Sequence, residues 1–304
     1  MRKFLLHSAL FLTLILGSMI FVFYQADGHT DPFYARFTSP PQSSLIIGTS
    51  KAAQGLRPDV LNKTLPDSIY NFAFTVAHSP YGPAYLNGIK RKLSNIDTAK
   101  RGVFIVVVDA WSISDANEDP NDETQFDENK SFLNQLTSLS SNPNFPYLLG
   151  YYKNHFAKIF DRDTVAFLHE DGWLEINTRM ATHVIDQRIE NKLVSLGEKR
   201  NRYQLSKTRL SYLYETIAFL KERGDVFVVT LPVHPDLTEI DLAVVPEFTE
   251  LMFTLSRDLY VPYLDLSYEN AEYTYTDGIH LYKESAWEVS ERVARWIKLE
   301  SRPR

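Results

Sequence analysis

The stretch GVFIVVVDA, residues 102–110, is apolar over six consecutive positions, 103–108, and this apolar run stops at Asp109. A strand with one face in water alternates apolar and polar residues, whereas a strand covered on both faces need not. Four other β-rich runs are bounded by turn or helix signals: SLIIG (44–48), SIYNFAFTVA (68–77), DVFVVTL (225–231) and VPYLDLS (261–267). We therefore expect a five-stranded, mostly parallel sheet that is buried on both faces.

Helical patterns separate these runs, at residues 84–96, 205–224, 248–259 and 283–300. The second ends in Lys221, Arg223 and a glycine, which is typical of a helix stop. Strands that alternate with helices predict a three-layer α/β/α domain, here over residues 44–304. In such domains ligands bind beyond the carboxyl ends of the strands.

The N-terminus has Arg2 and Lys3 followed by a nearly unbroken apolar stretch at residues 4–24. About 20 apolar residues can cross a hydrocarbon core of about 30 Å. No A-x-A-like cleavage site follows, so we expect an uncleaved transmembrane anchor over residues 1–24, with a cleaved signal peptide as the alternative. The basic flank predicts that the domain lies on the extracytoplasmic side. Residues 25–43, rich in Pro and Gly signals, are expected to form a linker.

Composition excludes several classes of function. The 304 residues contain no cysteine, which excludes thiolate catalysis, Cys-based zinc sites and disulfides. A net charge of −6 without a basic stripe gives no indication of a nucleic-acid partner.

Residues 112–204 fit the alternation poorly and are expected to be an insertion that forms a lid or binding loops. Its acidic start, DANEDPNDETQFDENK (115–130), lacks the EF-hand spacing and is expected to be a solvated loop.

Two short motifs carry candidate chemistry. Ser50 ends the first strand run in GTS, and Asp277 and His280 form a D-x-x-H pattern in TDGIH before the last helix. A serine hydroxyl needs a base within hydrogen-bond reach, and that base needs a carboxylate to fix its tautomer. Taken alone, GTS is typical of a helix N-cap and D-x-x-H of a capped surface loop. Their joint placement, at the first strand and before the last helix of one α/β domain, favours a catalytic triad.

This arrangement resembles the SGNH (GDSL-like) hydrolase superfamily, in which the first block reads G-D-S or G-[ST]-S and the last block is D-x-x-H. The likeness covers most of residues 44–299 apart from the insertion, and it is to the membrane-anchored branch associated with cell-envelope acyl esters. That branch includes polysaccharide O-acetyl esterases, acetyltransferases and teichoic-acid D-alanyl transfer proteins. The resemblance implies a flavodoxin-like fold, no cofactor and no metal, with Ser50 as nucleophile, His280 as base and Asp277 as orienting carboxylate.

The oxyanion hole departs from that family, where a glycine N–H and an asparagine side chain serve as donors. Here the second strand run ends in TVAHSP without a glycine, and the third ends in DAWS without an asparagine. A carboxylate stabilises an oxyanion only when protonated, so the aspartate of DAWS is expected to fix the loop instead. The oxyanion and substrate-binding candidates are Ala77, His78, Asp109, Ser112 and His234.

Two functions follow from this pattern. The first is a membrane-anchored, extracytoplasmic serine esterase or acyltransferase that acts on acyl, most simply acetyl, esters of an envelope glycan or on a small ester. The second is a weakly active or inactive protein of the same fold, which binds a glycan, a membrane-bound acyltransferase or a polysaccharide-export partner. An intact Ser-His-Asp set favours the first, and the missing asparagine favours the second.

Overall fold

A computed structural model of the chain describes residues 1–304 except 26, 28, 67, 95–100, 153–164 and 302–304. Its centre is a five-stranded sheet with the order β2-β1-β3-β8-β9, in which every pair of neighbours is parallel. This confirms the predicted fold class. The strands are β1 (Ser44–Ile47), β2 (Ile69–Asn71), β3 (Gly102–Val107), β8 (Gly224–Thr230) and β9 (Tyr263–Asp265).

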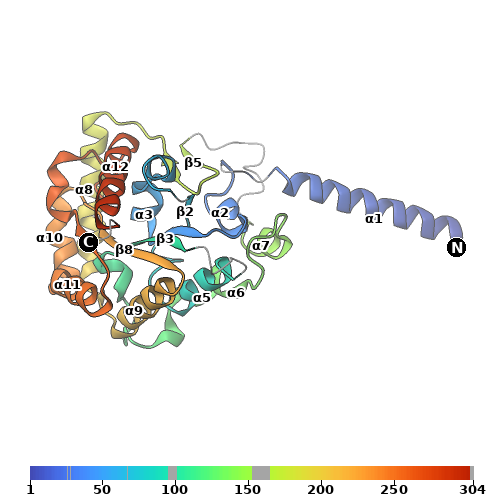
Figure 1. The fold of residues 1–304 in the computed structure, drawn as a ribbon. Coiled ribbons are helices and arrows are strands. Elements are labelled where there is room, and N and C mark those ends of the chain that lie inside the picture. The colour runs from blue at the N-terminus through green and yellow to red at the C-terminus, as the bar shows by residue number, and fades with distance from the viewer. Residues whose placement is uncertain (26, 28, 67, 95–100, 153–164, 302–304) are drawn as a thin grey trace.

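Helices cover both faces of this sheet (Figure 1). One hydrophobic core includes side chains of α5 (Pro83–Lys92), α9 (Lys207–Lys221) and α11 (Phe248–Leu259), and the other includes those of α3 (Ser50–Gly55), α4 (Pro58–Leu61) and α12 (Lys283–Glu300). In β3, Phe104 and Val106 enter the first core, whereas Val103 and Ile105 enter the second. The unbroken apolar run in the sequence is therefore explained by two buried faces.

The N-terminal helix α1 (Arg2–Phe23) projects from the domain (Figure 1). Its stretch Arg2–Val22 has a mean hydropathy of 2.2 and no residue of the tested window is buried, so it is long and apolar enough to span a membrane. The following segment differs from the expected linker. It contains α2 (Tyr34–Thr38), whose Tyr34 and Phe37 are buried in the domain core. Pro32 and Pro40 flank this short packed helix.

The second strand run is shorter than expected, because β2 leaves the sheet after Asn71. The Asn71 side chain accepts a hydrogen bond from Ala73 N–H and donates to the carbonyls of Ala52 and Leu56. Asn71 therefore has a structural role beneath α3.

The remaining elements lie outside the five-stranded sheet. Most belong to the insertion, and the others follow β8 and β9: η1 (Ala110–Ile113), β4 (Ser114–Asp115), η2 (Glu123–Gln125), η3 (Asp127–Lys130), α6 (Phe132–Gln135), α7 (Phe145–Gly150), β5 (Ala166–Leu168), β6 (Leu174–Ile176), α8 (Thr182–Arg200), β7 (Gln204–Leu205), α10 (Pro235–Val244) and η5 (Ser267–Glu272).

The acidic segment 115–130 is not a freely solvated loop, which corrects the expectation. Asp115 and Glu128 are buried, and both bind the buried guanidinium of Arg209 on α9. The Arg209 Nε donates to Asp115 Oδ2 at 3.1 Å and its Nη1 donates to Glu128 Oε1 at 2.6 Å. The sequence does not indicate this ion pairing, because Arg209 lies at least 81 residues along the chain from either carboxylate.

Lys92, at the end of α5, is fully buried against the segment that follows α2. Its ammonium nitrogen contacts the carbonyl oxygen and the hydroxyl of Ser39, at 2.5 and 2.6 Å. These partners are uncharged, and burial lowers the pKa of Lys92 to about 7.

This burial predicts a pH-dependent stability. Between pH 7 and the ordinary lysine pKa of 10.5, the unfolded chain binds up to one more proton at Lys92 than the folded chain, so stability rises with pH. We expect the free energy of unfolding to increase by about 1 kcal/mol per pH unit from pH 7 to 9 relative to Lys92→Met. Thermal unfolding of both detergent-solubilised chains at several pH values measures this slope, and parallel slopes would contradict the prediction.

Candidate active site

Ser50 is the first residue of α3, just beyond the carboxyl end of β1, which lies between β2 and β3 in the sheet. The turn between them depends on Gly48, whose φ is +146°. A Cβ at that position would lie 2.9 Å from the carbonyl oxygen of Val107 on β3. Glycine therefore allows β1 and β3 to pack closely where the chain turns, and this turn holds the Ser50 side chain above the edge of the sheet.

His280 and Asp277 come from the loop between β9 and α12, and they reach the same edge. The Nε2 atom of His280 lies 2.9 Å from Ser50 Oγ, and its Nδ1 lies 3.0 Å from Asp277 Oδ1. The three side chains thus form a hydrogen-bonded chain in the order Ser50–His280–Asp277. A serine, a histidine base and an orienting carboxylate in this order have the geometry that nucleophilic catalysis requires.

The D-x-x-H loop is held by its own backbone. Asp277 Oδ1 accepts hydrogen bonds from the N–H groups of Ile279 and His280, both at 3.1 Å. Gly278 has a φ of +87°, and its carbonyl accepts a hydrogen bond from His234 N–H at 2.7 Å. The carboxylate is therefore fixed before any substrate binds.

The charge of Asp277 is stabilised by two neighbours. Burial alone would raise its pKa, but hydrogen bonding and charge from His280, together with the charge of Lys192, hold the pKa of Asp277 well below its usual range. The Lys192 ammonium lies 3.2 Å from Asp277 Oδ2. Asp277 is thus ionised at neutral pH and can stabilise the imidazolium that forms when His280 takes a proton.

A cleft of about 150 Å³ opens at Ser50 and His280. Part of its wall is α8 of the insertion, and part is Trp111 and Tyr203, whose rings meet edge-on with centroids 5.1 Å apart. Its described lining residues are Ser50, Lys51, Val76, Asp109, Trp111, Lys192, Leu196, Lys199, Tyr203, Ile279 and His280.

Asp109, which follows β3, also lines this cleft. Its Oδ1 accepts Ser112 N–H at 2.9 Å, and its Oδ2 lies 3.3 Å from the Thr49 hydroxyl. The neighbouring cation is Lys51, whose Nζ is 3.9 Å from Asp109 and 2.7 Å from Asp241. Asp109 therefore fixes the start of η1. The charged hydrogen-bond donor nearest to its carboxylate is the buried ammonium of Lys51.

Three of the expected oxyanion donors lie away from the cleft. Ser112 is fully buried, and its N–H and hydroxyl both bond Asp109 in a capping box. His78 packs its ring against Phe33 and Phe132, and burial lowers its pKa to about 4. Ala77 is exposed but does not line the cleft, whose rim here is Val76.

His234, the remaining candidate, has structural contacts. Its Nδ1 accepts a hydrogen bond from Asp236 N–H at 3.3 Å and so caps α10. Its ring packs edge-on against Tyr275, and its backbone supports Gly278. His234 thus stabilises the D-x-x-H loop from behind and does not line the cleft.

Sequence reasoning missed the lysines of the cleft. Lys51 follows Ser50 directly, but nothing in the sequence indicates that it is buried between two carboxylates. Lys192 and Lys199 lie in the insertion, and the hydropathy pattern of α8 does not show which face meets the domain. Only their contact with distant elements reveals them.

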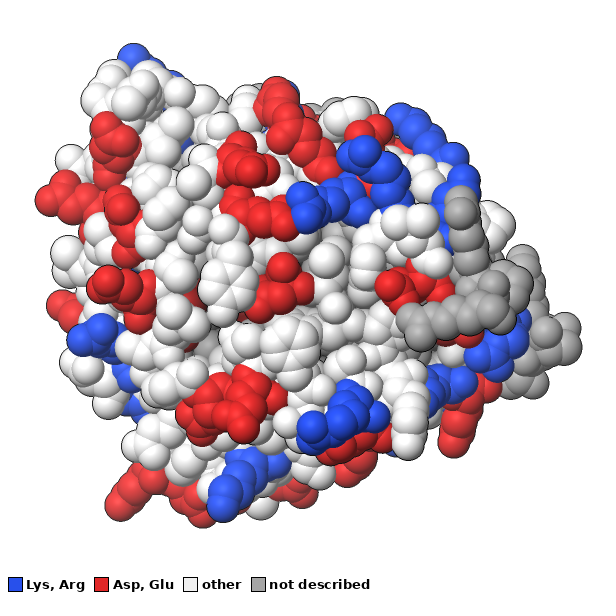
Figure 2. Space-filling model, turned by 60° about the vertical axis from the view of Figure 1, so that its left-hand side comes forward, with Lys and Arg blue, Asp and Glu red and all other residues white. Residues whose placement is uncertain are grey.

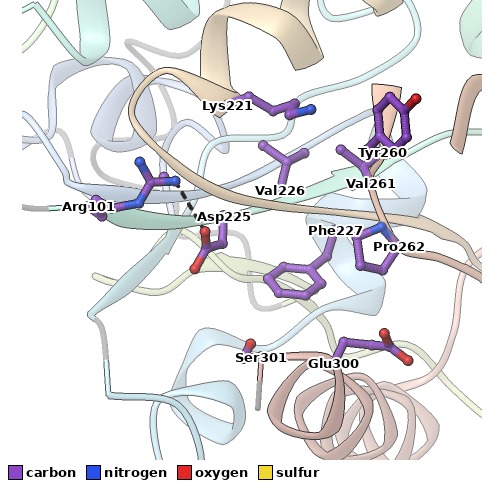
Figure 3. A pocket seen from close by; sticks show the side chains of 11 residues that line it. Arg101, Lys221, Asp225, Val226, Phe227, Tyr260, Val261, Pro262, Glu300 and Ser301 are labelled. Carbon is purple, nitrogen blue, oxygen red and sulfur yellow. Dashed lines mark hydrogen bonds and ion pairs between the residues drawn. The ribbon is translucent and has the colours of Figure 1, made fainter. Parts of the chain in front are cut away.

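Larger cavities exist elsewhere. One of about 320 Å³ lies at the amino end of β8 and is shown in Figure 3, with Arg101 and Asp225 ion-paired across 3.2 Å. Among the described residues that line it there is no histidine, and it lies at the opposite end of the sheet from Ser50. Within the described part of the chain, no group of three or more His, Asp or Glu side chains could hold a metal ion.

No protein-family model and no curated protein sequence matches this chain. Solved structures match it at low identity. An inhibitor-bound aryl esterase from M. smegmatis is 12% identical, with a TM-score of 0.38 over 84% of this chain and 99% of that chain. A second solved structure is 13% identical, with a TM-score of 0.39 over 86% of this chain and 100% of the other. At these TM-scores the likeness does not identify the reaction, which must be inferred from the site itself.

Proposed function

We propose that this protein is a serine esterase or acyltransferase that uses Ser50, His280 and Asp277. The observation that carries the proposal is the hydrogen-bonded chain from Ser50 Oγ through His280 to Asp277, open to a cleft at the carboxyl edge of a parallel sheet. Structural serines seldom need a histidine that is itself oriented by a carboxylate. Nucleophilic catalysis does need one.

In the proposed reaction, Ser50 Oγ attacks the carbonyl carbon of an acyl ester while His280 Nε2 takes the hydroxyl proton. The tetrahedral intermediate collapses, the bond from the carbonyl carbon to the alcohol oxygen breaks, and His280 returns the proton to the leaving alcohol. Water or a sugar hydroxyl then attacks the acyl-serine with His280 as base. The products are a free acid or a new ester, together with regenerated Ser50.

We further propose that the domain is anchored by α1 and acts outside the cytoplasm on acyl, most simply acetyl, esters of an envelope glycan. The basic Arg2 and Lys3 before the apolar span support this orientation. Figure 1 shows α1 leaving the domain on the side opposite α8 and α10. Since α8 lines the cleft, this arrangement supports a substrate away from the bilayer.

A fluorophosphonate probe tests the nucleophile. We expect the wild-type chain to be labelled covalently and Ser50→Ala to lose the label. Ser267→Ala is the matched control, because Ser267 lies just past β9 at the same edge but donates its hydroxyl to Asp265. Equal labelling of wild type and Ser50→Ala would overturn the proposal. Unlabelled wild type would instead favour a binding protein for a glycan, a membrane-bound acyltransferase or an export partner.

A further inference from the structure

The face of α8 that meets the cleft carries two lysines. Lys192, Leu196 and Lys199 stand at i, i+4 and i+7, which places them on one side of the helix, and all three line the cleft. Lys192 lies at the triad end, beside Asp277. Seven residues of helix rise by about 10 Å, so Lys199 lies roughly two turns farther from the reacting serine.

Charge compensation differs sharply among the lysines of the cleft. Lys51 binds Asp241 at 2.7 Å and Lys192 binds Asp277 at 3.2 Å. Lys199 forms no ion pair with any carboxylate in the described part of the chain, and its side chain is exposed to solvent at the rim. Only one carboxylate, Asp109, is among the described residues that line the cleft. An anion bound beside Lys199 would therefore meet a cation with no competing partner.

The excess of lysines over carboxylates is confined to the cleft. Figure 2 shows acidic and basic side chains mixed over one face of the molecule, without a single sign of charge dominating it. The net charge of the whole chain is −6, so long-range attraction does not explain a basic site. Recognition of an anion must then come from the side chains of the cleft.

We propose that the ester bound in this cleft carries an anionic group, a phosphate or a carboxylate, which Lys199 binds while Ser50 attacks the acyl carbon. Trp111 and Tyr203 supply an aromatic wall of the same cleft. This inference rests on the proposed function, because it names the class of ester that the triad would cleave.

Three esters test the proposal in kinetics: phenyl acetate, 4-acetoxybenzoate and 4-acetoxyphenyl phosphate. The full chain in detergent is compared with Lys199→Met, Lys199→Arg and the control Arg200→Met, which alters the next exposed residue of α8 but none that lines the cleft. We expect Lys199→Met to lower kcat/KM for an anionic ester about tenfold more than for phenyl acetate. Lys199→Arg should retain most of the preference. Arg200→Met should leave all three rates unchanged.

The two anionic esters distinguish a phosphate from a carboxylate site. An equal loss for neutral and anionic esters in Lys199→Met would overturn the inference while leaving the esterase proposal intact. If Arg200→Met lowers kcat/KM for the anionic esters as much as Lys199→Met does, the inference is also overturned and the esterase proposal is unaffected.

Binding keeps the inference testable if no ester is hydrolysed, which would itself count against the proposed function. Phenyl phosphate and benzoate are titrated calorimetrically into the wild-type chain, Lys199→Met and Arg200→Met. Affinity for at least one anion that falls about tenfold in Lys199→Met alone supports the anion site. Affinities that are the same in all three proteins, or no binding of either anion to wild type, overturn it.

Discussion

Asp277→Asn is expected to lower kcat for 4-nitrophenyl acetate by about 10⁴-fold, the loss caused by the same change at the orienting carboxylate of a serine protease triad. The amide oxygen of asparagine can still accept the N–H groups of Ile279 and His280, so the loop keeps its shape. The amide also presents N–H donors, which favour the tautomer of His280 with its proton on Nε2. That tautomer cannot accept the proton of Ser50.

The comparison requires a carboxylate outside the triad. Asp236→Asn serves, because Asp236 is an exposed residue at the start of α10 and its side chain lines no part of the cleft. Circular dichroism of both variants checks that the fold is retained. A loss of less than tenfold in Asp277→Asn would contradict an orienting role for this residue, whatever the behaviour of Ser50→Ala.

The parallel sheet could be predicted from the sequence because burial on both faces leaves a local trace. The run at residues 103–108 sends alternate side chains into two cores, and both sets must be apolar. The order of the strands could not be predicted, because it depends on how the crossover helices pack and not on any local pattern.

The buried helix α2 was not predicted because five residues are too few to show a helical period.

The proximity of Ser50, Asp277 and His280 was also predictable, because parallel strands bring their carboxyl ends to one edge and both motifs lie there. Their catalytic roles remain predictions. The donors around them were not predictable. Ser112 looked available in the sequence, but a capping box with Asp109 uses both its N–H and its hydroxyl. Which face of α8 meets the cleft is likewise decided by tertiary packing.

The insertion shows most clearly what the sequence alone could not reveal. Its acidic start has the composition of a solvated loop, yet Arg209 binds both Asp115 and Glu128 in the interior. The guanidinium also lies over the ring of Phe126, with 3.7 Å between its Cζ and the ring centroid. A single side chain of α9 thus fastens residues 115–128 to the domain, and those residues lead from the cleft wall at Trp111 into the insertion.

Arg209→Met is therefore expected to destabilise the protein by about 3–5 kcal/mol, since it leaves two buried carboxylates without a counter-charge. Thermal unfolding of the detergent-solubilised chain measures the effect. Arg101→Met is the matched control. It removes an ion pair with Asp225 in which both side chains are 61% exposed, and surface pairs of this kind contribute about 0–1 kcal/mol.

The burial of these two carboxylates also predicts a rescue. Adding Asp115→Asn and Glu128→Gln to Arg209→Met removes the uncompensated charges while keeping side chains of similar size, and should restore more than half of the lost stability. If Arg209→Met costs no more than Arg101→Met, the cluster does not fasten the insertion. If the triple variant is as unstable as Arg209→Met, the loss arises from packing on Phe126 and not from charge. Together, the two results show whether Arg209 stabilises the insertion by its charge or by the packing of its side chain against Phe126.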